Sequence, residues 1–406
     1  MNDPIVSAVQ DCVDAGDLAG AATLVWRDGK VVHSGCVGWR DVDAKLPIER
    51  DTLFRIASMT KPVTSAAALM LLEEGRFALD DPIARWAPEF AQARVLRSPD
   101  GPLDCTDPAA RPITFEDLLT HRSGLTYGAF HNGPIASAYA QALGGDIDST
   151  VAPDDWIAGL SALPLIDQPG TAFHYGHSTD LLGLLIARME DAPLGDVLAR
   201  RLFAPLGMKD TAFTVPKAKQ DRRARLYGFD AAGKLVARPT AAGGSTLAER
   251  PEDMEYVSGG QGLWSTVDDY LAFARIFVGA GQVDGQRLLK PETVALMTAN
   301  RLSESQRIGA RYLGMPVFAA GNGFGLGVAV VIDPATASAL RGRGGPGTVG
   351  WPGAFGGWWQ ADPTDGSVMI FLAHNVLERE QLVDGIGIGV FGAIVQFHAL
   401  AASQPH

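Results

Sequence analysis

Residues 54–64 read FRIASMTKPVT and place a serine and a lysine three positions apart, at Ser58 and Lys61. The chain from 58 to 74 is rich in Ala, Leu and Met, and its spacing predicts a helix. Pro62 lacks a backbone N–H and is tolerated only in the first turn of a helix, so the helix should begin between Ser58 and Lys61. Because helical residues three apart share one face, the Lys61 ammonium can reach the Ser58 hydroxyl.

The expected place of Ser58, at a helix N-terminus, suits a nucleophile. That terminus carries roughly half a positive charge, which favours an alkoxide and a neighbouring oxyanion. A serine hydroxyl attacks a carbonyl only when another group takes its proton. A lone S-x-x-K motif is more often a solvated helix start with a snorkelling lysine, so further motifs must support it. No G-x-S-x-G string occurs in the chain, which excludes the usual nucleophile elbow of α/β-hydrolases.

Strand patterns lie on both sides of this helix along the chain. Residues 21–39 predict two strands around Asp28-Gly29, a dipeptide that favours a tight hairpin. Further strands are expected at 325–332, 348–355, 358–361 and 368–373, and a final helix is expected near 383–401.

The middle of the chain has a different character. Residues 80–224 are dense in Pro and Gly and hold short helical patterns, such as 115–119 and 181–189, with few strand signals. We therefore expect an α+β fold, with an antiparallel sheet flanked by helices and an inserted mainly helical region. The sheet domain should be discontinuous, at 1–79 and 225–406, with 80–224 as the mainly helical region.

Composition limits the classes of function. The chain has 406 residues, 47% of them hydrophobic, and can bury a large core. Its 34 Lys and Arg against 46 Asp and Glu give a formal net charge of −12, which argues against a nucleic-acid partner. The longest apolar runs fall short of the ~20 residues that a membrane span needs, and no secretory signal is visible at the N-terminus. We expect a cytoplasmic protein without a membrane partner.

Metal and disulfide chemistry are not indicated. The three cysteines, Cys12, Cys36 and Cys105, lie far apart and form no C-x-x-C pair. No H-E-x-x-H string occurs, and His174 with His177 has no supporting acidic cluster, so no metal site is expected.

Further motifs follow FRIASMTKPVT in order along the chain. They are DLLTHRSGL at 117–125, FHYGHS at 173–178, DLLG at 180–183, GGQGLWST at 259–266 and DDY at 268–270. Together the motifs resemble the serine β-lactamase and penicillin-binding protein superfamily. Within it the chain is most similar to the family VIII carboxylesterases, which are relatives of the class C β-lactamases. The resemblance extends from about Ala21 to Ala373 and implies a β-lactamase-like fold.

The resemblance implies a catalytic triad of Ser58, Lys61 and Tyr175. Ser58 would attack the carbonyl carbon, and Tyr175 or Lys61 would carry its proton to the leaving alcohol. A phenol acts as a base only where nearby positive charge stabilises the phenolate, and Lys61 can supply that charge. The alternative for Tyr175 is a core tyrosine whose hydroxyl bonds to the backbone.

Residues 350–358 read GWPGAFGGW and should edge the site. β-Lactamases carry a K-T-G triplet here, whereas WPG at 351–353 resembles the W-x-G of family VIII esterases. The lysine that would pair with the carboxylate of a lactam is therefore missing. The backbone N–H groups of Ser58 and Ala354 are the expected oxyanion donors.

Substrate binding is expected to involve Trp351, Gly353, His177 and Tyr127. Trp351 offers an apolar wall, with an ordinary strand tryptophan as the alternative, and Gly353 lets a substrate approach the backbone closely. His177 stands where β-lactamases carry the Asn of Y-x-N. Its expected role is to orient Lys61 or to titrate near neutral pH, with a structural role as the alternative.

The resemblance implies a serine carboxylesterase that hydrolyses small, short-chain carboxylic esters through an acyl-enzyme, without a metal or an organic cofactor. The alternatives left open are a β-lactamase or D-alanyl-D-alanine peptidase, an acyltransferase, and an inactive binding homologue of the same fold. The sequence defines neither the natural ester nor the oligomeric state.

Overall fold

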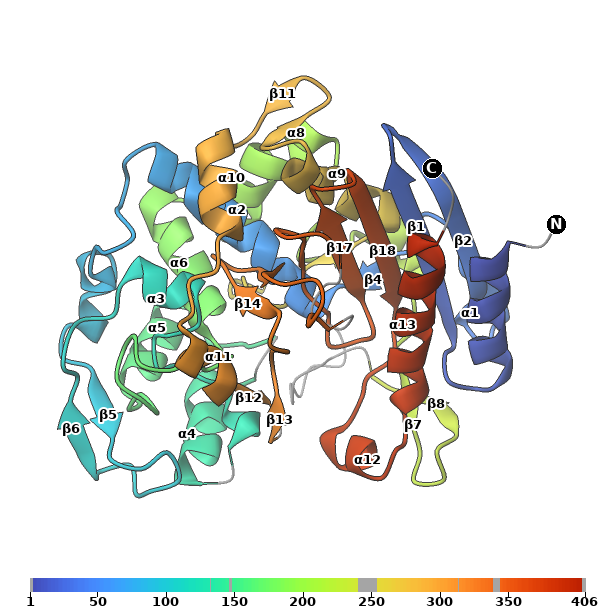
Figure 1. Cartoon of the computed structure of the whole chain (residues 1–406). Coiled ribbons are helices and arrows are strands. Elements are labelled where there is room, and N and C mark those ends of the chain that lie inside the picture. Colours follow the sequence, from blue (N-terminus) through green and yellow to red (C-terminus); the bar gives the residue numbers. More distant parts are fainter. Residues whose placement is uncertain are drawn as a thin grey trace.

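The computed structural model describes residues 3–131, 133–145, 148–239, 254–312, 314–338 and 344–403. These residues form an eight-stranded sheet in the order β14-β15-β16-β17-β18-β1-β2-β3, and every neighbouring pair is antiparallel (Figure 1). The strands are β1 (Gly20–Arg27), β2 (Lys30–Asp41), β3 (Leu46–Pro47), β14 (Asn322–Phe324), β15 (Ala329–Val331), β16 (Val349–Gly350), β17 (Trp358–Asp362) and β18 (Ser367–Ala373). The expected α+β class, with an antiparallel sheet flanked by helices, is confirmed.

The hairpin between β1 and β2 confirms the expectation for residues 21–39. Asp28 and Gly29 have φ values of 52° and 77°, which a tight hairpin turn requires and which Asp and Gly tolerate. The two strands pair from Gly20 opposite Gly38 to Arg27 opposite Lys30.

Both faces of the central strands are buried. Along β18, Val368, Ile370 and Leu372 belong to one apolar cluster, and the alternate residues Met369 and Phe371 belong to another. Because successive strand residues point to opposite faces, helices must cover both sides of the sheet. This explains why the sequence here is continuously apolar rather than alternating.

The terminal helices cover one face of the sheet. Helices α1 (Pro4–Asp14) and α13 (Ile388–Ala402) pack against each other, α1 contacts β2, and α13 contacts β18 (Figure 1). The other face is covered by α9 (Val267–Val278), which contacts β17, β18 and β1. The final helix is split, because α12 (Arg379–Val383) is separated from α13 by Gly385 and Gly387, both with a φ of 80°.

Two expected strands are shorter than predicted. The segment 325–332 is a turn followed by β15, because Gly327 has a φ of 87° and the Gly325 N–H donates to Val328 O. The segment 348–355 is in strand conformation only over β16, and residues 351–357 form a turn instead. Both predictions were wrong because glycines that permit a turn lie inside an apolar run.

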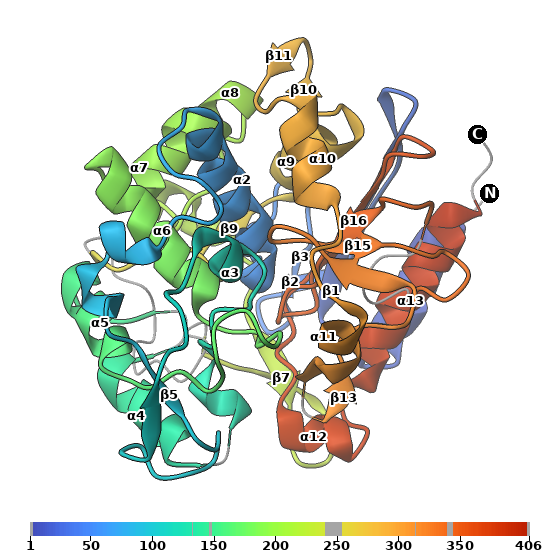
Figure 2. The same cartoon turned by 60° about the vertical axis from the view of Figure 1, so that its left-hand side comes forward.

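The nucleophile helix α2 (Thr60–Glu73) lies between the sheet side and the helical region (Figures 1 and 2). Every residue from Thr60 to Leu71 is buried, including the polar side chains of Lys61, Thr64 and Ser65 in its first two turns. It packs on α6 (Ser178–Glu190), which also contacts α3 (Phe115–Leu119). The other helices are α4 (Pro134–Leu143), α5 (Pro153–Ser161), α7 (Leu194–Leu198), α8 (Ala204–Leu206), α10 (Pro291–Thr298) and α11 (Glu304–Gly309).

One apolar cluster runs through both expected regions. It includes Leu69 of α2, Trp156 of α5 and Ile370 of β18. The boundaries at residues 79–80 and 224–225 therefore stay a prediction, because the core is continuous across them. Within the described ranges, no helix is both long and apolar enough to cross a membrane.

Candidate active site

The segment before Ser58 is held by a short strand pair and a strained turn. Strand β4 (Phe54–Arg55) pairs with β9 (Trp264–Ser265), and a 3₁₀ turn, Ala57–Met59, leads into α2. Ala57 has a φ of 45°, which is uncommon for a residue with a side chain and is often found at functional sites. Ser58 therefore lies just before α2, where the first N–H groups of a helix have no partner within it. The predicted start of the helix is confirmed.

Lys61 is completely buried and has an acceptor for each of its three N–H groups. Its Nζ lies 3.3 Å from Ser58 Oγ, 3.0 Å from the Tyr127 hydroxyl oxygen and 3.0 Å from the Gly260 carbonyl oxygen. The expected contact between Lys61 and Ser58 is confirmed. This arrangement fits an ammonium group that donates all three hydrogens, and such a group has no lone pair with which to accept the Ser58 proton.

Two tyrosines approach Lys61 in different ways. Tyr127 uses its hydroxyl oxygen, whereas Tyr175 presents its ring, with the centroid 4.5 Å from Lys61 Nζ. Tyr127 is buried and Tyr175 is half-buried. No hydrogen bond between Ser58 and Tyr175 occurs in the described part of the chain, so the role of Tyr175 as base stays a prediction. Sequence reasoning missed the bond between Tyr127 and Lys61, because loop residues show no helical spacing relative to Lys61.

The hydroxyl of Tyr175 is held by Trp351. The Trp351 indole N–H donates to the Tyr175 hydroxyl oxygen over 2.9 Å, and the ring centroids are 5.3 Å apart. Trp351 is buried in an apolar cluster with Phe173, Phe318 and Phe324. The structure therefore gives Trp351 a specific partner in the site, which favours a functional role over that of an ordinary strand tryptophan.

The turn that carries Ala354 packs against the nucleophile segment. The Gly353 N–H donates to Gly357 O over 2.7 Å, and a Cβ on Gly353 would lie 2.5 Å from the Ile56 carbonyl oxygen. Position 353 therefore needs glycine for its contact with Ile56, and the close approach of a substrate stays a prediction. The Ala354 N–H has no backbone acceptor among the described residues, so it stays a candidate oxyanion donor beside Ser58.

His177 is fully buried, and its Nδ1 lies 3.0 Å from Asp180 Oδ2. The ring of Tyr127 packs edge-on against the His177 ring, with the centroids 4.5 Å apart. This placement puts His177 behind Tyr127 and favours the structural role over contact with substrate.

His121 lies behind Tyr175 and was not singled out from the sequence. Its ring is fully buried, with its centroid 4.8 Å from that of Tyr175. Burial and the positive charge of Lys61 hold the pKa of His121 well below its ordinary value, so the imidazole is neutral.

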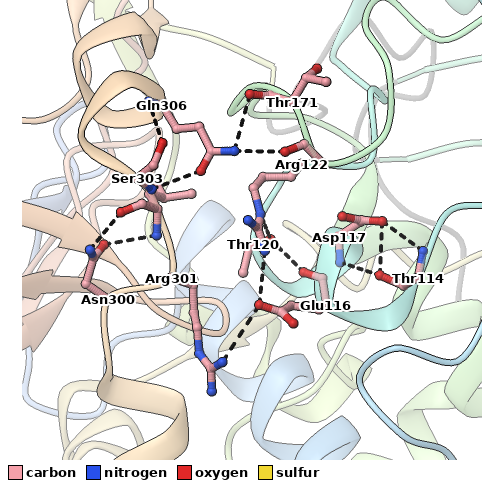
Figure 3. Close-up of polar contacts among 12 residues, drawn as sticks. Thr114, Glu116, Asp117, Thr120, Arg122, Thr171, Asn300, Arg301, Ser303 and Gln306 are labelled. Carbon is pink, nitrogen blue, oxygen red and sulfur yellow. Dashed lines mark hydrogen bonds and ion pairs between the residues drawn. The ribbon is translucent and has the colours of Figure 1, made fainter. Parts of the chain in front are cut away.

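Polar contacts anchor the loop that carries Tyr175 (Figure 3). The Gln306 side-chain amide donates to the carbonyl oxygens of Gly170 (2.8 Å) and Thr171 (3.2 Å). Nearby, two arginines form ion pairs with Glu116. Arg301 Nη1 lies 3.8 Å and Arg122 Nη2 lies 3.0 Å from Glu116 Oε1. These contacts join the helical region to α11, through Gln306, and to the segment before α11, through Arg301, on the side of the site where Tyr175 lies.

Asp180 and Gly260 belong to the site although sequence reasoning gave them no role. Both lie in the quoted motifs, and the spacing of three between His177 and Asp180 at a helix start was the available signal. Within the described ranges, no group of three or more His, Cys, Asp or Glu side chains could hold a metal ion.

Known proteins share this architecture. The family profile described as Beta-lactamase matches residues 5–386. Protein Rv1367c of Mycobacterium tuberculosis (strain ATCC 25618 / H37Rv) is 47% identical over 369 residues, which cover 91% of this chain and 89% of the relative. Esterase EstB of Burkholderia gladioli is 31% identical over 373 residues, which cover 89% of this chain and 87% of EstB. The solved structure of EstCE1, described as a hydrolase with promiscuous acyltransferase activity, has a TM-score of 0.76 at 25% identity, covering 96% of this chain and 97% of EstCE1.

Proposed function

Because the chain belongs to the beta-lactamase family and is a serine hydrolase of that fold, we propose that it hydrolyses short-chain carboxylic esters through an acyl-enzyme on Ser58. The relatives EstB, named an esterase, and EstCE1, a hydrolase, support an ester substrate. The tripeptide WPG at 351–353 supports it further, because it lacks the lysine that would bind the carboxylate of a lactam.

The observation that carries the proposal is the contact between Lys61 Nζ and Ser58 Oγ at the start of α2. The positive charge of the ammonium and the partial positive charge of the helix N-terminus both favour a developing alkoxide on Ser58. Since the three N–H groups of Lys61 all have acceptors, the ammonium acts by its charge, and another group takes the proton.

In the proposed mechanism, Ser58 Oγ attacks the ester carbonyl carbon and the phenolate of Tyr175 accepts its proton. The carbonyl oxygen becomes an oxyanion that the N–H groups of Ser58 and Ala354 stabilise. When the intermediate collapses, the C–O bond of the ester breaks and the alcohol leaves with the proton from Tyr175. Water then attacks the acyl-enzyme, gives up a proton to Tyr175, and releases the carboxylic acid as Ser58 regains its proton.

A panel of p-nitrophenyl esters from acetyl to palmitoyl tests this function. We expect the highest kcat/KM on the short acyl chains and no hydrolysis by Ser58→Ala. A preference for palmitoyl, or no hydrolysis of any ester by the folded protein, would contradict the proposal. A chromogenic cephalosporin in the same assay tests the β-lactamase alternative.

Acyl transfer is the second candidate, because EstCE1 combines hydrolysis with promiscuous acyltransferase activity. Both reactions share the acyl-enzyme, and only the acceptor differs. Adding a small alcohol to the ester assay separates them: transfer gives the ester of the new alcohol, whereas hydrolysis gives only the free acid.

A further inference from the structure

The buried acid Asp180 is connected to Lys61 through one glycine. The Asp180 carboxylate, in the first turn of α6, accepts hydrogen bonds from the Gly260 N–H (3.0 Å) and from the Ser258 hydroxyl. The carbonyl oxygen of the same Gly260 accepts from Lys61 Nζ over 3.0 Å. Asp180 therefore fixes the residue that orients the ammonium.

The close approach of this carboxylate requires a glycine. A Cβ on Gly260 would lie 3.0 Å from both oxygens of Asp180. That distance is tighter than nine in ten contacts of real Cβ atoms, so a side chain here would require the carboxylate to move by a few tenths of an ångström from the backbone that binds Lys61.

Asp180 is ionised although it is fully buried. Burial opposes its ionisation, but the hydrogen bond from His177 and the positive charges of His177 and Lys61 outweigh that cost and hold the pKa of Asp180 below its ordinary value. A buried charge is stable only when an opposite charge or hydrogen bonds compensate it, and the ammonium of Lys61 is such a charge.

The groups that face this pair come from several elements. His177 precedes α6 and contacts Asp180 directly, and Ser258 and Gly260 approach from the segment before β9. On the side of Lys61 lie Tyr127 and Tyr175, with the neutral His121 behind them.

We propose that Asp180 is a positioning residue of the active site and the buried counter-charge of Lys61. It holds the Gly260 carbonyl against one N–H of the ammonium, so that the other two are directed to Ser58 and Tyr127. The inference rests on the proposed function only for its effect on activity, because the pairing of charges can be measured without a substrate.

The first experiment is a double-mutant cycle on thermal stability, with Lys61→Met, Asp180→Asn and the double variant. Each single change leaves one buried charge without its partner and should lower the unfolding midpoint. The double variant should lose clearly less than the sum of the two losses. Additive losses of the unfolding midpoint would contradict the role of Asp180 as the counter-charge of Lys61. If Asp180→Asn does not fold alone, recovery of folding in the double variant supports the proposal, and failure to recover contradicts it.

The second experiment compares the pH profile of kcat/KM in the wild type, Asp180→Asn and the control Asp117→Asn. Asp117 is equally buried, but it pairs with Arg111 and belongs to the capping box of α3. Loss of the negative charge beside Lys61 favours the deprotonated form of every neighbouring group, so both limbs of the profile should move to lower pH by about one pH unit. The control Asp117→Asn should be less stable than the wild type, but neither limb of its kcat/KM profile should shift.

An equal loss of kcat/KM at every pH in Asp180→Asn would show a purely structural role and overturn the proposal. Failure of the proposed function is distinguishable from this result. If the wild type hydrolyses no ester, the double-mutant cycle on the unfolding midpoint can still be measured, because it needs no substrate.

Discussion

The indole N–H of Trp351 donates a 2.9 Å hydrogen bond to the hydroxyl oxygen of Tyr175, whose ring faces the ammonium of Lys61. The residue that stands in place of the K-T-G lysine therefore contacts the expected base directly. A donor at this oxygen stabilises a phenolate more than a phenol.

Replacing Trp351 by Phe keeps an aromatic ring but removes this donor. We expect Trp351→Phe to lower kcat/KM about tenfold, the effect of losing one hydrogen bond to a charged group. The matched control is Trp358→Phe. Trp358 is fully buried in β17, and its indole N–H has no hydrogen-bond partner among the described residues. Equal catalytic losses in the two variants would remove Trp351 from the mechanism.

The two tyrosines beside Lys61 predict different losses. If Tyr175 is the base, Tyr175→Phe should lower kcat by about a thousandfold, within the range for general base catalysis. Tyr127→Phe should cost only about tenfold, because it removes one hydrogen bond to the ammonium. The measurement is kcat on one short-chain ester. A larger loss in Tyr127→Phe than in Tyr175→Phe would transfer the role of base to Tyr127.

Lys61 and Tyr175 should also act as a unit. Lys61→Ala removes the charge that allows Tyr175 to accept a proton, so the double variant with Tyr175→Phe should be little worse than the poorer single variant. Lys61→Arg should not restore activity, because the planar guanidinium is larger than the ammonium and cannot reproduce its three contacts. Strictly additive losses in kcat/KM would break the coupled mechanism.

Penicillins should be turned over slowly or not at all. The chain has Trp351 where a lactam-binding lysine would lie. The structure buries Trp358 and Trp359 in the apolar clusters on the two faces of the sheet, so neither adds the bulk at the site that their sequence position suggests. We expect kcat/KM for a penicillin to be far below that for p-nitrophenyl butyrate. Comparable kcat/KM values for the two substrates would favour the β-lactamase alternative over the esterase.

Acid should destabilise the fold through His374. Burial lowers the pKa of His374 to about 3, although its Nδ1–H donates to Ala224 O. Below pH 6.5 the unfolded chain binds a proton at His374 that the folded chain does not bind. The contribution of this histidine to the free energy of unfolding is therefore complete above pH 6.5 and is lost as the pH falls toward 3. Over that window the loss amounts to roughly 2–5 kcal/mol.

Urea unfolding of the wild type and His374→Phe between these pH values measures the effect. The unfolding free energy of the variant should fall less steeply as the pH is lowered. At pH 6.5 it should be lower than that of the wild type, because the hydrogen bond from His374 to Ala224 is lost. Identical pH slopes would contradict the assignment to His374. The neutral, buried His121 contributes with the same sign and remains in both proteins.

The sequence predicts those parts of the fold and site that depend on local periodicity. The Asp28-Gly29 hairpin, the start of α2 and the contact between Lys61 and Ser58 follow from spacing along one element. The turn at Gly327 could not be predicted, because its cause is a close approach: a Cβ there would lie 2.1 Å from Ser65 Oγ.

The same limit applies to the surroundings of Lys61. Its acceptors Tyr127 and Gly260 come from loops far along the chain, and tertiary packing brings them to Lys61. The link between Asp180 and Lys61 follows in turn from the position of Gly260, so the spacing of three between His177 and Asp180 could not by itself reveal it.

The central claim is that Ser58 carries the acyl group. The direct measurement is intact-protein mass spectrometry after rapid mixing with p-nitrophenyl butyrate and acid quenching, followed by peptide mapping. We predict one butyryl group per chain, located on Ser58, and none on Ser58→Ala. An acyl group on another residue, or continued hydrolysis by a correctly folded Ser58→Ala, would contradict the account.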